Sequence, residues 1–320
     1  MKKYVSSVLF TKSSACLTAL LAIPVLLSVF QGCTREETPK KVSLSSRAGE
    51  TAEAVASPQP NTLWFGFDLR LGPKEEVMIY TPFLQYLETT TGKRFRIKFT
   101  ESYEDTVENL GRGITQFASL DTLNYVTGAS RYGVRYLVSG VNREGDPRYH
   151  SAIIAMPDSP VHDLADLRGR CFAFGAKMST QGHLIPRKML EDAGITLEDL
   201  SSSRFTGSHM NALKAVLNGE CDAAGVQDTL ATAFASEGTV RIVKISGAYP
   251  SSIIAYNSSV DSNTVEAVRA ALLAFDPRGK HRDLLFDWDR TEMPMGFTRV
   301  EEPEFTRVAI LARKYGLLTP

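Results

Sequence analysis

The sequence lacks the features of a nucleic-acid-binding protein and of a metalloenzyme. Its 36 Lys and Arg residues are balanced by 36 Asp and Glu residues, so no basic excess favours nucleic acid as a partner. Cysteine and histidine are scarce, with four and five residues, and no CxxC or Cys/His spacing indicates a metal site. Paired carboxylates and a Ser/His/Asp spacing are not visible either. We therefore predict no catalytic residue, no metal and no cofactor.

The N-terminus is the one strongly apolar part of the chain. An apolar stretch over residues 15–30, interrupted by Pro24, follows a pair of lysines. It is too short for a good membrane span but suits the core of a signal peptide. It leads into Phe30-Gln31-Gly32-Cys33, which resembles a bacterial lipobox with Phe at the usual Leu position. We predict a lipoprotein signal peptide over residues 1–32 and a lipid anchor on Cys33. A plain secretory signal and an uncleaved anchor helix are the alternatives.

The segment after this signal has no periodic apolar pattern. Residues 33–60 are rich in Ser, Ala and Pro, which predicts a disordered tether. Two further cysteines, Cys171 and Cys221, lie in the remaining body of the chain. An oxidising compartment permits a disulfide between them, whereas two small buried residues are the simpler interpretation. Geometry decides between the two, and the sequence leaves the question open.

From residue 63 onward, short apolar strands alternate with amphipathic helices. This pattern predicts an α/β protein whose sheets are mainly parallel and flanked by helices. The order of the elements places one lobe, residues 148–247, inside another made of residues 62–147 and 248–320. Two extended crossings between the lobes make a hinge and a cleft. We expect strands near residues 63–67, 95–99, 117–120, 136–141, 151–156, 171–175, 221–225, 240–245 and 253–256, and helices near 77–91, 103–112, 183–193, 211–217, 263–275 and 303–315.

Hydroxyl and other hydrogen-bonding side chains follow most of the predicted strands. Ligands of open α/β sheets bind beyond the carboxyl ends of the strands, so these junctions are candidate sites. The segment Ser179-Thr180-Gln181-Gly182 is the most informative, because a helix start binds phosphate-like anions through free N–H groups. Ordinary N-capping is the competing interpretation. Asp121-Thr122 forms a similar junction. His209 either donates to an anion or is structural, and Asp228 either binds a ligand cation or caps its helix.

Several segments, taken in their order and spacing, carry a resemblance to a known family. They are YTPFLQYLE at 80–88 with TGK at 91–93, SY at 102–103, YHSAII at 149–154 with DSP at 158–160, DLRG at 166–169, FG at 174–175 with STQGHLIP at 179–186, GSH at 207–209, and NGECDA at 218–223. Together they resemble the phosphate/phosphite/phosphonate-binding proteins of ABC transporters. The resemblance implies the two-lobe, type 2 periplasmic-binding fold, closing around its ligand.

The resemblance also implies roles for individual residues. Ser179 and Thr180 would hold the oxyanion at the helix start, and Tyr103 and His209 would add side-chain donors. Asp228 falls where family members that bind an aminoalkyl phosphonate place an acid for the amino group.

The sequence departs from the family pattern at three places. Gln181 replaces the second Ser of a Ser-Thr-Ser-Gly motif. Ser251-Ser252 stand after Pro250, where the family has an Asp that accepts a hydrogen bond from a protonated P–OH. Asp121 stands where the family has Gly. A carboxylate there could take over the P–OH role or select against a dianion, since an anion buried beside an unprotonated carboxylate is costly unless the two share a proton.

We therefore expect a monomeric lipoprotein, anchored to a membrane in the periplasm or at the cell surface, that captures a phosphorus oxyanion for an ABC importer. The expected ligand is a phosphonate, phosphite or phosphate, and the expected protein partner is the permease. A sensory or partner-binding lipoprotein of the same fold is one alternative. An enzyme on this fold is the other.

Overall fold

The computed structural model of the protein describes residues 62–68, 73–100, 102–301 and 303–318. The predicted signal peptide, Cys33 and the predicted tether lie outside the described residues. Among the helices within these ranges, none is both long and apolar enough to cross a bilayer.

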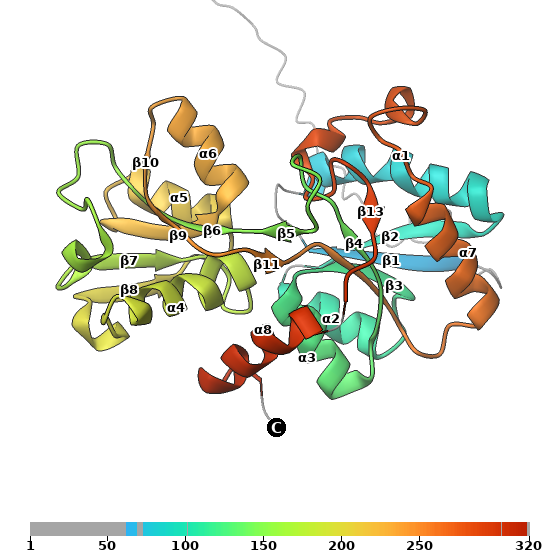
Figure 1. The fold of residues 1–320 in the computed structure, drawn as a ribbon. Coiled ribbons are helices and arrows are strands. Elements are labelled where there is room, and N and C mark those ends of the chain that lie inside the picture. The colour runs from blue at the N-terminus through green and yellow to red at the C-terminus, as the bar shows by residue number, and fades with distance from the viewer. Residues whose placement is uncertain (1–61, 69–72, 101, 302, 319–320) are drawn as a thin grey trace, which may run out of the picture. The chain divides into compact units, whose positions relative to one another are not determined.

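The strands form two main sheets, one in each lobe (Figure 1). The first lobe has a six-stranded sheet in the order β13-β4-β12-β3-β1-β2. Its strands are β1 (Thr62–Asp68), β2 (Arg94–Thr100), β3 (Phe117–Leu120), β4 (Arg135–Gly140), β12 (Ile253–Tyr256) and β13 (Phe297–Thr298). The second lobe has a five-stranded sheet in the order β10-β6-β9-β7-β8. Its strands are β6 (Ser151–Ala155), β7 (Cys171–Phe174), β8 (Ser202–Phe205), β9 (Ala223–Gln227) and β10 (Arg241–Ile245).

Helices cover both sheets. The helices of the first lobe are α1 (Pro73–Thr91), α2 (Tyr103–Gly111), α3 (Thr122–Tyr132), α7 (Ser262–Leu273) and α8 (Pro303–Lys314), and those of the second lobe are α4 (Ile185–Asp192), α5 (His209–Leu217) and α6 (Asp228–Ser236). In the first lobe, α1 and α7 lie on one side of the sheet, and α2 and α3 lie on the other (Figure 1). Phe65 and Phe67 of β1 belong to the cluster that α1 and α7 cover, together with Phe83 and Val268. This burial of large apolar side chains is the main stabilising contribution to the lobe.

Most strands of each sheet run in one direction, as expected, but each sheet also contains antiparallel neighbours. β1 runs parallel to β2 and β3, and β7 runs parallel to β8 and β9. β12 is antiparallel to β3 and β4, and β6 is antiparallel to β9 and β10. Both antiparallel strands directly follow a crossing between lobes, so each enters its sheet without a preceding helix packed on that sheet. A parallel neighbour requires such a crossover connection, and an antiparallel one does not.

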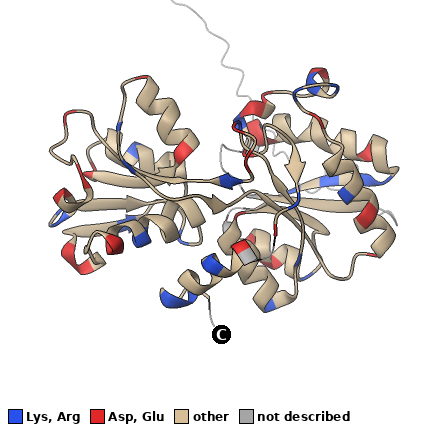
Figure 2. Ribbon diagram, viewed as in Figure 1, with Lys and Arg blue, Asp and Glu red and all other residues tan. Residues whose placement is uncertain are grey.

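The two crossings pair with each other. β5 (Arg148–Tyr149) and β11 (Tyr249–Pro250) form a short antiparallel ladder in which Tyr149 faces Tyr249. This ladder lies between the two sheets in Figure 1. The α/β two-lobe fold with two crossings is thus confirmed. Charged residues of both signs are interspersed along the helices and loops of both lobes (Figure 2), in keeping with the balanced composition.

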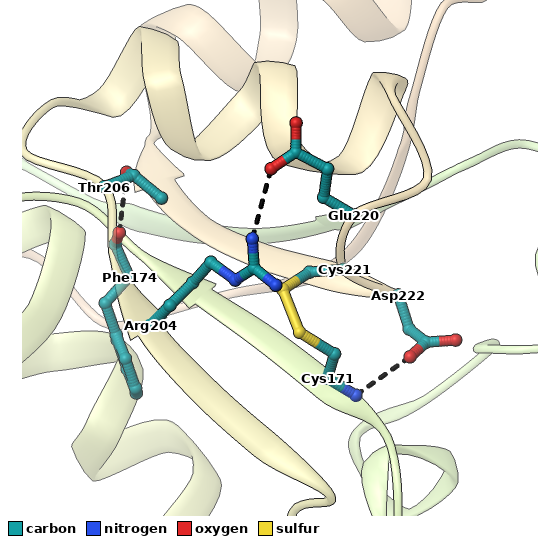
Figure 3. The surroundings of a disulfide bond; sticks show 7 residues. All are labelled: Cys171, Phe174, Arg204, Thr206, Glu220, Cys221 and Asp222. Atoms are coloured by element: carbon teal, nitrogen blue, oxygen red, sulfur yellow. Dashed lines mark hydrogen bonds and ion pairs between the residues drawn. A yellow bond between two sulfur atoms is a disulfide. The ribbon is translucent and has the colours of Figure 1, made fainter.

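A disulfide links the starts of two neighbouring strands in the second lobe (Figure 3). It joins Cys171 at the start of β7 to Cys221 just before β9, with the two Cα atoms 4.7 Å apart. Asp222 accepts a hydrogen bond from the backbone N–H of Cys171 at 2.8 Å, which fixes the same junction. The structure therefore answers the question that the sequence left open, in favour of the bridge.

Candidate ligand site

The predicted anion site in the second lobe is a helix start. Beyond β7 the chain turns at Gly175 and enters η3 (Thr180–Leu184), a π-helical turn that continues directly into α4. Ser179 is the N-cap, and its Oγ accepts a hydrogen bond from the N–H of Gly182 at 3.0 Å. The side chain of Ser179 therefore caps its own helix, which was the competing interpretation of this residue.

Gly182 is required by close packing at this turn. Its carbonyl accepts from the N–H of Gly175 at 2.8 Å. A Cβ on Gly182 would lie 3.0 Å from Cε1 of His209 and 3.2 Å from Cα of Gly175. The imidazole of His209, the first residue of α5, thus lies against the helix start. The structure thus places His209 beside the predicted site.

A second helix start, in the first lobe, meets the first. Asp121 is the N-cap of α3, and its Oδ1 accepts hydrogen bonds from the N–H and the side-chain Nδ2 of Asn124, at 2.9 and 2.8 Å. Its Oδ2 accepts from the backbone N–H of Thr180, at 2.7 Å. In return, the N–H of Leu123 donates to Oγ1 of Thr180 at 2.8 Å. These two hydrogen bonds join the lobes directly.

The electrostatics of this junction favour negative charge. Each helix start carries a partial positive charge and backbone N–H groups without a helical partner. Asp121 and Thr180 are almost fully buried, at 3% and 0% exposure, and hydrogen bonds to a charged group are stronger in such surroundings than in water. The arrangement can therefore hold one small anionic group between the lobes, and the carboxylate of Asp121 is such a group.

The returning crossing completes the same region. Oγ1 of Thr122 donates to the carbonyl of Pro250, and Oγ of Ser251 donates to Oε1 of Gln181 at 3.4 Å. Gln181 is buried, and its Nε2 has no hydrogen-bond partner within the described ranges. A buried amide donor of this kind is costly unless a ligand or water accepts from it.

Two carboxylates lie along the crossings. Ser252, whose φ of 54° is unusual for a residue other than glycine, donates through Oγ to Oε2 of Glu292 at 2.5 Å. Asp228 accepts hydrogen bonds from the N–H groups of His150 and Thr229, at 3.1 and 2.8 Å. Burial raises the pKa of Asp228, and the negative charge of Glu292 acts in the same direction.

Glu292 is the residue that sequence reasoning missed. It lies in an irregular segment, outside any predicted strand, helix or motif, and is 6% exposed. The only signal was indirect: a Ser stands at 252, near where the family has an acid, and this Ser turns out to hold a carboxylate 40 positions away.

Comparisons with known proteins show the family of this chain. The family model of the periplasmic substrate-binding protein of phosphonate ABC transporters matches residues 65–303. This chain belongs to that family. The resemblance drawn from the sequence is therefore confirmed.

Individual relatives are more distant. The phosphate-import protein PhnD of Mycolicibacterium smegmatis is 26% identical over 224 residues, which cover 67% of this chain and 65% of the relative. The phosphonates-binding periplasmic protein of Escherichia coli is 27% identical over 187 residues, or 57% and 55% of the two chains. The match thus spans less than two thirds of each relative. The structure of PhnD1 from Prochlorococcus marinus in complex with methylphosphonate superimposes with a TM-score of 0.72 at 16% identity, covering 81% of this chain and 100% of that chain.

In this member of the family, the predicted site residues fall into three groups. The first group is brought together between the lobes, the second lies at the helix start after β7, and the third lies along the crossings. The groups are Asp121, Thr122, Thr180, Gln181 and Ser251; then Ser179 and His209; then Ser252 and Asp228. Tyr103 begins α2, and its side chain lies outside the described residues. Within the described ranges, no cluster of three or more His, Cys, Asp or Glu side chains could hold a metal ion.

Proposed function

We propose that the protein captures a small phosphorus oxyanion (a phosphonate, phosphite or phosphate) outside the cytoplasm and delivers it to the permease of an ABC importer. One observation carries the proposal: helix starts from both lobes meet at Thr180, where backbone N–H groups of Thr180 and Leu123 are engaged between the lobes. Two such helix starts neutralise a tetrahedral anion without Lys or Arg. The names of the relatives, a phosphate-import and a phosphonates-binding protein, support the same ligand class.

An oxyanion can bind at this junction only after the two lobes separate. Asp121, Thr180 and Ser251 are buried within the protein itself, so a ligand reaches them only when the contacts between the lobes break. The paired crossings β5 and β11 are the natural hinge, because short extended segments between rigid lobes absorb such a change. Opening and closing would then expose and hide the surface that the permease recognises.

We further propose that the protein acts as a monomer held at a membrane by a lipid on Cys33. The Phe30-Gln31-Gly32-Cys33 sequence supports the anchor. The disulfide between Cys171 and Cys221 supports an oxidising compartment. Neither feature fits an enzyme better than a carrier, and a carrier needs no turnover.

A thermal-shift screen tests the capture of an oxyanion. Methylphosphonate, phosphite and phosphate are added separately, and at least one is expected to raise Tm, because a ligand that binds only the native state stabilises it. Isothermal titration with that anion then compares the wild type with Thr180→Val. Loss of a charge-assisted hydrogen bond costs about 1.5–3 kcal/mol, so we expect binding weaker by about tenfold or more. His209→Ala is expected to weaken binding as well.

Thr127→Val is the matched control. Thr127 is buried in the same helix as Leu123, and its hydroxyl donates to the carbonyl of Leu123 within that helix. The same chemical change is therefore made one helical turn beyond the junction, at a hydroxyl that bonds only within α3 in the described structure, and affinity should stay at the wild-type value. If no oxyanion raises Tm, the proposed capture is wrong. If Thr180→Val and His209→Ala both bind like the wild type, the anion lies elsewhere.

A further inference from the structure

The carboxylate of Asp121 already stands between the two helix starts. Its Oδ1 is held by its own helix through Asn124, and its Oδ2 accepts from the N–H of Thr180 in the other lobe, at 2.7 Å. Carboxylate and phosphonate oxygens accept short hydrogen bonds from N–H groups in the same way. Oδ2 of Asp121 therefore occupies the position that the proposed function gives to one oxygen of the ligand.

A ligand oxyanion and the carboxylate of Asp121 cannot both occupy this position while both are negatively charged. Two like charges in a buried site repel strongly, and one of them must be displaced or protonated. Displacement means that the Oδ2 contact with Thr180 breaks while the helix cap stays formed. The bonds to Oδ1 lie within α3 and hold the cap in place.

A buried polar atom without a partner indicates that a ligand binds near this contact. Nε2 of Gln181 is buried, and within the described part of the chain it has no hydrogen-bond partner. Gln181 directly follows Thr180, and Asn124 donates to the carboxylate itself. The amide of Gln181, the residue after Thr180, is thus a buried donor that is not yet used and that a ligand oxygen could satisfy.

We propose that Asp121 sets the affinity and selectivity of the site by acting as an internal carboxylate that competes with the ligand oxyanion. The inference rests on the proposed function for the identity of the ligand. It has two consequences. Neutralising residue 121 tightens oxyanion binding, and it loosens the contact between the lobes when no anion is added.

Asp121→Asn is the decisive variant. Asn is as good an N-cap as Asp, so α3 keeps its start while the negative charge is lost. Asp121→Ser serves as the second variant, because Ser also caps a helix but is too short to reach Thr180. Asp261→Asn is the matched control: Asp261 caps α7 through a hydrogen bond from the N–H of Thr264 at 2.9 Å, within the first lobe.

The experiment has two arms on the purified protein. Isothermal titration with methylphosphonate and with inorganic phosphate measures affinity, and hydrogen exchange without added anion measures protection of the segment around Thr180. We expect Asp121→Asn and Asp121→Ser to bind at least tenfold more tightly than the wild type and to exchange faster at that segment. Asp261→Asn should match the wild type in both arms.

The outcomes separate this inference from the proposed function. Unchanged or weaker binding in both Asp121 variants overturns the inference and leaves the function standing, because the carboxylate then helps to hold the ligand. If no variant binds either anion, the proposed function is wrong. In that case the competition falls with the function, and the exchange arm reports only whether Asp121 holds the lobes together.

Discussion

The disulfide between Cys171 and Cys221 allows a prediction whose size follows from the chain itself. The bridge joins residues 50 positions apart, and the loop that it closes contains η3, α4, β8 and α5. It therefore encloses Thr180 and His209, and with them the second lobe's share of the candidate site. Replacing both cysteines with alanine is the perturbation. Alanine leaves no hydroxyl at Cys221, which is almost fully buried, so no new unsatisfied polar group is introduced.

The expected magnitude comes from the loop length. In the chain-entropy account, cross-linking a loop of this size lowers the entropy of the unfolded chain by an amount equivalent to about 4 kcal/mol at 25 °C. For a domain of this size, each kcal/mol shifts Tm by about 2–4 °C. The double variant should therefore melt about 8–16 °C below the wild type. We expect no change in the fold, because the sheet pairings of β7 with β8 and β9 do not depend on the sulfur atoms.

Calorimetry with and without a reducing agent makes the measurement specific. Dithiothreitol should lower the Tm of the wild type to that of the double variant and should leave the variant unchanged. A single Cys171→Ala variant should behave like the double variant, which separates the covalent bond from the packing of Cys221. A difference below about 1 kcal/mol between oxidised and reduced protein would refute the reasoning, since it would mean that the bridge does not constrain the unfolded chain.

Periodicity predicted most of the secondary structure but not which strands run antiparallel to the others. The expected strand at 171–175 is β7 (Cys171–Phe174), and the expected helix at 211–217 is the later part of α5, which begins at His209. The expected helix at 263–275 is α7 (Ser262–Leu273). The antiparallel course of β6 and β12 was not predicted, because the apolar pattern of a buried strand is the same whichever way the strand runs.

The residue types at the helix starts made part of the candidate site predictable from the sequence. Ser179, Asp121 and Asp228 stand at helix starts, and their residue types identify them as caps or ligands without separating the two roles. Contacts such as that of Asp121 with Thr180, 59 residues apart, are tertiary. No spacing rule in a single sequence encodes them. The same holds for Ser252 and Glu292, whose pairing depends on how an irregular segment returns to the crossing.

Two further predictions concern the lipid anchor and the protein core. Cys33→Ser should release the protein from membranes into the soluble fraction and abolish labelling by a radioactive fatty acid; unchanged membrane association would contradict the anchor. His183 tests the burial of the helix start, because burial lowers its pKa to about 4 although its ring bonds the carbonyl of Lys177. The unfolded chain protonates this histidine below about pH 6.5 and the native state only below about pH 4. Native stability should therefore fall by about 3 kcal/mol as the pH drops between those values, with no contribution above them. Urea titrations at several pH values should show this slope in the wild type and in the exposed-site control His162→Gln, but not in His183→Gln. An equal slope in all three proteins would mean that His183 is protonated in the native state, and that the turn after β7 is open to water.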